Sequence, residues 1–133
     1  MGQQQLLLII LGVIIVGIAI AVGLSMFTAQ SVGANRDAII ADMTNLAANA
    51  YQFRIRPTTM GGGGGSYAGY TIAPSLASNE NGAYTLSGTP GATTVAFTGT
   101  SSQYTTDSVT GTYGADGKLS GSFSFAGPNF AGT

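Results

Sequence analysis

The sequence predicts an α+β protein: one long N-terminal helix, about residues 3–56, with an antiparallel sheet of four to five strands packed on its second half. Three observations support this prediction. A long uncharged stretch opens the chain, a proline- and glycine-rich break follows it, and an alternating apolar and polar pattern fills the rest. With 133 residues, the chain has room for one small globular domain besides the helix.

The first part of the predicted helix, residues 1–28, is apolar. The first charged side chain is Arg36, and residues 6–27 are almost wholly aliphatic. At about 1.5 Å per residue this run makes a helix of roughly 33 Å, enough to cross the hydrocarbon core of a bilayer. The segment therefore predicts a membrane span or an equally apolar environment.

The second part of the helix, residues 29–56, is amphipathic. It contains no proline and only one glycine, Gly33, so the helical pattern continues without a break. Apolar residues recur at spacings of four, three, four and three and form one stripe. We expect this stripe to pack against the sheet: Ile39, Met43, Leu46, Ala50 and Phe53.

Residues 57–65 should end the helix, because Pro57 cannot continue it and five glycines follow at 61–65. We interpret this segment as a flexible hinge before a sheet domain of residues 66–133. Alternation predicts strands around residues 70–72, 84–86, 95–97, 109–113 and 119–125. The last two strands should form the best-defined hairpin, with serine and threonine on the solvent face.

Composition excludes several classes of function. The chain has no cysteine and no histidine, so thiolate metal sites and Cys or His catalysis lack their residues. Four Lys and Arg residues are too few for the basic surface that nucleic-acid binding needs. The spacing of Glu80, Asp107 and Asp116 matches no calcium loop. We therefore expect no enzyme, no cofactor, no metal and no nucleic-acid partner.

Three interpretations of the apolar segment compete. A secretory signal peptide could end at Ala19-Ile20-Ala21, but no positive region precedes the apolar run, which continues to Phe27. A single-pass anchor carrying a β domain for adhesion or binding is the second. Neither explains why the helix continues for about seven more turns.

The third interpretation is a filament subunit, whose apolar helix moves from the membrane into the core of a helical bundle. Small residues would let such helices approach closely. The residues that we expect to pack in this core are Leu6, Leu7, Ile10, Gly12, Ile14, Gly17, Ala21 and Gly23.

The start of the chain, Gly2-Gln3-Gln4-Gln5 followed by Leu-Leu-Leu-Ile-Ile, is similar to the segment around a prepilin cleavage site. With the helix, the loop and the sheet behind it, the whole chain resembles a type IV pilin. The resemblance implies cleavage after Gly2, and as partners a prepilin peptidase, an assembly ATPase and a platform protein. It also implies residence in the cytoplasmic membrane before assembly, and then an extracellular filament on the cell surface. The expected function is the major structural subunit of that filament, a helical homopolymer.

Charged positions depart from the pilin pattern. Type IV pilins usually carry a glutamate as the fifth mature residue, where this chain has Leu7 if cleavage follows Gly2. A buried terminal ammonium without a counter-charge is costly, so we expect the glutamine amides to solvate it or the new N-terminal glutamine to cyclise. Asp42 should be solvated or pair with an arginine of a neighbouring subunit. Further intersubunit salt bridges are expected from Arg36, Asp37, Arg54 and Arg56.

Overall fold

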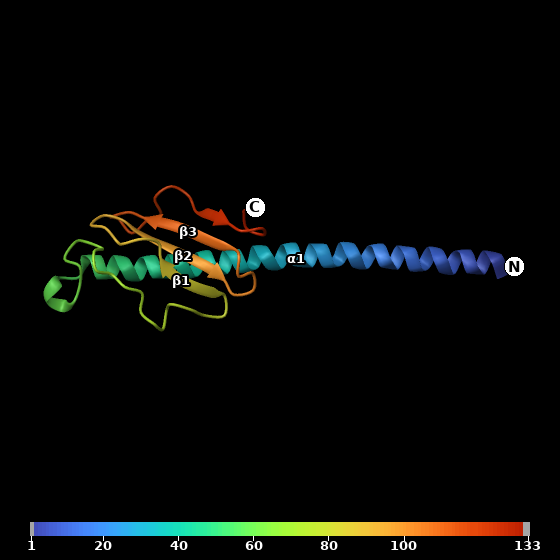
Figure 1. The fold of residues 1–133 in the computed structure, drawn as a ribbon, viewed down its shortest axis with the longest axis horizontal. Helices are drawn as coiled ribbons and strands as arrows, with labels where there is room; N and C mark the ends of the chain where they lie inside the picture. Colours follow the sequence, from blue (N-terminus) through green and yellow to red (C-terminus); the bar gives the residue numbers. More distant parts are fainter. Residues whose placement is uncertain (1, 132–133) are drawn as a thin grey trace. The chain divides into compact units, whose positions relative to one another are not determined.

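The computed structural model describes residues 2–131 and has the predicted α+β architecture. One helix, α1, begins at Gly2 and ends at Ile55, and a short 3-10 helix, η1, follows at Thr58–Met60. Four strands come after it: β1 (Gly82–Leu86), β2 (Val95–Ser101), β3 (Ser108–Tyr113) and β4 (Ser124–Ala126). The sheet packs against the second half of α1 (Figure 1). The prediction of one long helix and four to five strands is confirmed, and the number of strands is four.

The chain divides into two compact units, one ending at Ala34 and the other beginning at Asn35. The first unit is the N-terminal part of α1. The second contains the rest of α1, the connecting loops and the sheet. No break in α1 marks the boundary. The second unit therefore has its own core.

The four strands form one antiparallel sheet in sequence order, β1-β2-β3-β4. Alternate residues of β2 and β3 are buried, as a sheet with one covered face requires. The buried side chains include Val95, Phe97, Val109 and Tyr113. Hydroxyl side chains occupy the other face, where the Thr98 and Thr110 hydroxyls lie 3.3 Å apart.

The predicted helix stripe lies in this core. Ile39, Met43 and Ala50 are fully buried and Leu46 nearly so, while Phe53 at the end of the stripe is partly exposed. Glycine in β2 permits the close approach of helix and strand. A Cβ atom at Gly99 would lie 2.6 Å from Ile39 Cγ2, closer than two carbon atoms can pack.

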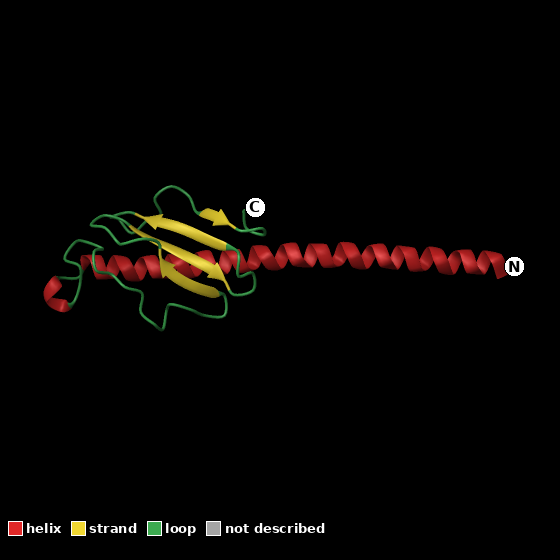
Figure 2. Cartoon of the chain, in the orientation of Figure 1, coloured by secondary structure: helices red, strands yellow, loops and turns green. Residues whose placement is uncertain are grey.

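The predicted strand at residues 70–72 does not form. The alternation there is short and lies between Gly69, whose φ is +87°, and a turn that begins at Ala73. Tyr70 instead enters the core as a single anchor. Its ring packs edge-on against Phe53 and Phe97, with centroids 5.5 Å and 6.1 Å away. Figure 2 shows the connection between η1 and β1 as a loop.

The predicted final hairpin forms, but its second strand is shorter than expected. Leu119 pairs with Tyr113, and Phe125 pairs with Val109. Between these pairs the last segment advances by 125 − 119 = 6 residues and β3 by 113 − 109 = 4. The two extra residues break the pairing near Gly121, whose φ is +85°.

The glycine-rich segment folds back onto the end of α1. Two glycine N–H groups donate to carbonyls of the last helical turn: Gly63 to Phe53 at 2.8 Å and Gly65 to Arg54 at 2.6 Å. Gly64 donates to the carbonyl of Arg56, just after the helix, at 2.9 Å. Helices leave these carbonyls without partners inside the helix, so the segment acts as a C-terminal cap. Its movement as a hinge stays a prediction.

Candidate functional site

The apolar part of α1 is exposed along its whole length in the first unit. Every large apolar side chain from Leu6 to Phe27 is between 53% and 71% exposed. The helix is long and apolar enough to cross a membrane. Exposing a single Leu, Ile or Val side chain to water costs about 1.5–3 kcal/mol. This segment therefore needs lipid or other helices around it.

Glycines on this segment have no packing role within the chain. A Cβ atom added at Gly12, Gly17 or Gly23 would meet nothing within 4 Å. Each glycine nevertheless weakens a helix by about 1 kcal/mol relative to alanine. Ala21 and the predicted core positions Leu6, Leu7, Ile10 and Ile14 are exposed on the same segment. Gly2, the predicted cleavage position, is the first residue of α1.

The four charged residues assigned to intersubunit bridges lie at two places, one within α1 and one at its C-terminal end. Arg36 and Asp37 are neighbours, with a nitrogen to oxygen distance of 3.9 Å, and the Arg36 guanidinium lies 5.2 Å from the centre of the Phe125 ring. Arg54, in the last helical turn, lies 5.7 Å from the centre of the Tyr67 ring. Arg56 is exposed just after the helix. Their intersubunit contacts stay predictions.

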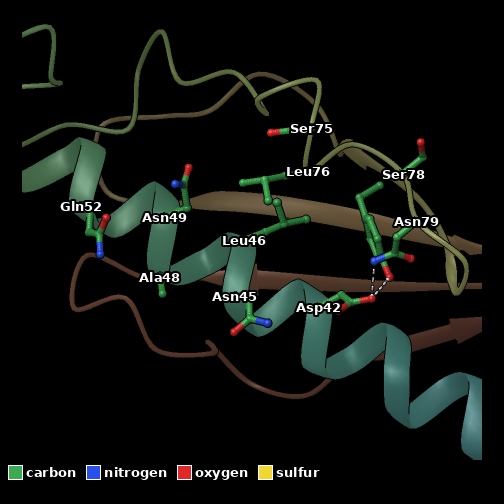
Figure 3. Close-up of a pocket in the computed structure, with 11 residues that line it drawn as sticks. Asp42, Asn45, Leu46, Ala48, Asn49, Gln52, Ser75, Leu76, Ser78 and Asn79 are labelled. Atoms are coloured by element: carbon green, nitrogen blue, oxygen red, sulfur yellow. Dashed lines mark hydrogen bonds between the residues drawn. The ribbon is translucent and has the colours of Figure 1, made fainter.

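The second unit contains a polar cluster around Asp42. One carboxylate oxygen, Oδ2, accepts hydrogen bonds from Asn79 Nδ2 at 2.8 Å and from the Tyr84 hydroxyl (Figure 3). The same oxygen accepts a third hydrogen bond from Asn81 Nδ2 at 3.0 Å. Burial raises the pKa of Asp42, but these three donors outweigh it and hold the pKa below the ordinary value. Asp42 therefore joins the helix to β1 and the loop before it.

The sequence analysis missed this role, because it treated Asp42 as solvated or paired with an arginine of a neighbouring subunit. Its partners lie 37 to 42 positions away along the chain. The one available signal was the Asn79, Asn81 and Gly82 group, which is typical of a turn that a carboxylate can bind.

A second carboxylate and two polar side chains hold other parts of the unit. Asp107 is fully buried and accepts hydrogen bonds from the backbone N–H of Asn129 at 3.0 Å and from its side-chain amide at 2.7 Å. Asn35 on α1 accepts from the Ser101 hydroxyl and donates to the Asn81 carbonyl at 3.2 Å. No group of three or more potential metal ligands occurs within residues 2–131.

No protein-family model, curated protein or solved structure matches this chain. The architecture, a long apolar N-terminal helix with a four-stranded antiparallel sheet, fits a pilin-like fold. Functional assignment therefore rests on the residues and geometry described above.

Proposed function

We propose that this chain is the major structural subunit of a type IV pilus-like extracellular filament and polymerises through the apolar half of α1. Its role is structural, not catalytic. One observation carries the proposal. A helix with 22 exposed, uncharged positions continues without a break into a second half whose apolar stripe is buried in a folded unit.

The apolar surface of this segment must be covered either by lipid or by other helices. In lipid the segment is stable as a single span. In a bundle of identical helices it exchanges lipid contacts for equally apolar ones, and van der Waals packing at small residues supplies the attraction. A Cβ atom at Gly12, Gly17 or Gly23 would meet nothing within 4 Å, so their small size is available for contacts between chains.

The resemblance to pilins gives the proposal its order of events. The chain waits in the cytoplasmic membrane, a prepilin peptidase cleaves after Gly2, and an assembly ATPase and platform protein add subunits to the growing filament. The folded unit would then coat the filament and form its solvent-exposed surface.

A monomeric single-pass protein that displays its β domain for adhesion or binding is the second candidate. It is favoured by the apolar segment alone, which is long enough to span a bilayer. An anchored monomer does not explain why the helix continues without a break or why the apolar segment contains these glycines.

Electron microscopy of sheared surface material, with mass spectrometry of the purified filaments, separates the two candidates. We expect filaments in which this chain is the main protein. Filaments without this chain, together with its recovery in the membrane fraction, would instead establish the anchored monomer.

A further inference from the structure

A groove lined with carboxamide and hydroxyl side chains lies between α1 and the loop before β1, within the second unit (Figure 3). Its volume is about 270 Å³. We call it the amide groove. Its lining residues are Asp42, Asn45, Leu46, Ala48, Asn49, Gln52, Ser75, Leu76, Ser78, Asn79 and Tyr84.

One wall of the amide groove is a polar stripe on α1. Asp42, Asn45, Asn49 and Gln52 follow each other at spacings of three, four and three, which places them on the same side of a helix. The Asn45 and Gln52 side chains are exposed. This stripe adjoins the apolar stripe that packs on the sheet, so the helix backbone that bears the amides is held in place.

The loop wall is also held in place. Asn79 is tied to Asp42 at 2.8 Å, the Leu76 N–H donates to the Ala73 carbonyl at 2.8 Å, and the Tyr84 N–H donates to the Ala77 carbonyl at 2.7 Å. Leu76 lies toward Leu46 across the groove and supplies apolar surface between the polar walls (Figure 3). Because the backbone of both walls is already held in place, a ligand would have to order only side chains of this groove.

The chemistry of the lining selects the ligand. No Lys or Arg lines the groove, so it offers no partner for phosphate or another anion. Its only charged group, Asp42, already accepts three hydrogen bonds at one oxygen. Carboxamides and hydroxyls both donate and accept, as the hydroxyl groups of a sugar do. The exposed Leu76 side chain suits the apolar C–H face of a sugar ring.

We propose that the amide groove binds an uncharged carbohydrate. The groove presents side chains, not an unpaired strand edge, so it suits a ligand with many hydroxyls better than an extended peptide. The site does not depend on polymerisation, because all its residues belong to one folded unit of one chain. The groove would therefore bind carbohydrate in an anchored monomer as well as in a filament.

The test uses the full chain in a detergent without a sugar headgroup, since an alkyl maltoside would compete. Saturation-transfer NMR measures binding of a panel of neutral oligosaccharides built from glucose, galactose, mannose or N-acetylglucosamine. The key variant is Asn45→Ala with Gln52→Ala, which removes two exposed amides from the wall. Gln103→Ala, an exposed amide in the loop after β2 and outside the groove, is the matched control.

We expect at least one neutral probe to bind, and the double variant to weaken it about tenfold, the effect of two lost hydrogen bonds. Gln103→Ala should leave binding unchanged. Binding that survives the double variant would place the sugar elsewhere and overturn the proposal. The absence of transfer from every probe would overturn it too. If the groove is covered by a neighbouring subunit in assembled filaments, that subunit occupies the groove instead of a sugar, and the proposal is wrong.

Discussion

The Tyr84 hydroxyl on β1 donates a hydrogen bond to the Asp42 carboxylate on α1, across 42 positions of sequence. This contact joins the sheet to the helix and forms one end of the amide groove. Asn79 and Asn81 bind the same carboxylate oxygen, so three donors from one short segment converge on a single helical residue. Asp42 is therefore a central polar link of the folded unit.

Asp42 should make the folded unit sensitive to acid. Its pKa is lowered in the folded state, so its contribution to stability is present above the ordinary value of 3.8 and is lost as the pH falls through the folded value. Denaturant midpoints from neutral pH down to about pH 2 measure this loss. Asp42→Asn should be less stable at neutral pH by about 1–3 kcal/mol and should show a flatter acid limb.

Glu80→Gln is the control for this measurement, because Glu80 is an exposed carboxylate on the same loop. If Asp42→Asn retains the full acid limb of the parent protein, other carboxylates cause the loss and the prediction is wrong.

Tyr84 should act at the opposite end of the pH scale. Burial raises its pKa from 10.0, and the Asp42 carboxylate raises it further, because a phenolate there would face a second negative charge. Its contribution is complete below the unfolded pKa and is lost as the pH rises toward the folded value. Tyr84→Phe should therefore reduce the alkaline loss of stability, measured by denaturant midpoints together with phenolate absorbance. An unchanged alkaline limb in this variant, with Tyr104→Phe as comparison, would contradict the assignment.

The glycine cap of α1 should tolerate no side chain at its centre. A Cβ atom at Gly63 would collide with the Ser66 carbonyl oxygen and lie 3.0 Å from the Phe53 ring. We expect Gly63→Ala to lower the thermal midpoint, because the backbone must move and the cap hydrogen bonds are lost. Gly33→Ala is the control: a Cβ there meets nothing within 4 Å, so it should stabilise the helix by up to about 1 kcal/mol. Equal thermal midpoints for Gly63→Ala and the parent protein would show that the cap does not constrain this position.

Replacing Gly17 by leucine should separate polymerisation from membrane insertion. The change adds apolar surface, and a Cβ atom at this position meets nothing within 4 Å, so the segment should still enter the membrane. In a tight helix bundle the larger side chain would hold the backbones apart. We expect Gly17→Leu to accumulate in membranes without filaments under the microscope. Ile18→Leu, which conserves volume, should assemble normally. Normal filaments from Gly17→Leu would mean that this glycine does not lie at a helix contact.

The mature N-terminus should carry no free ammonium. No acidic residue precedes Asp37, so a buried terminal charge would lack a counter-charge on its own segment. If cleavage follows Gly2, attack of the Gln3 amine on its own side-chain amide forms a ring and releases ammonia. Intact-mass and peptide spectrometry of assembled filaments should then find Gln3 first, lighter by one ammonia. An unprocessed, unmodified Met1 in filaments would refute both steps.

The sequence by itself determined the elements that depend on local patterns. Absence of charge up to Arg36 and of proline up to Arg56 predicted the long helix, and the stripe from Ile39 to Ala50 predicted the buried face. Alternation predicted five strands, of which four formed. These patterns repeat every few residues, so one chain suffices to detect them.

Only the tertiary structure decided the features that join distant residues. It placed Tyr70 in the core and not in a strand, shortened the last strand at Gly121, and folded the glycine run onto the helix end. It also brought Asn79, Asn81 and Tyr84 to Asp42 and so created the amide groove. The physical reason is that a hydrogen bond or a ring contact depends on distance in space, and the pairing of residues 42 and 84 leaves no periodic trace in the sequence.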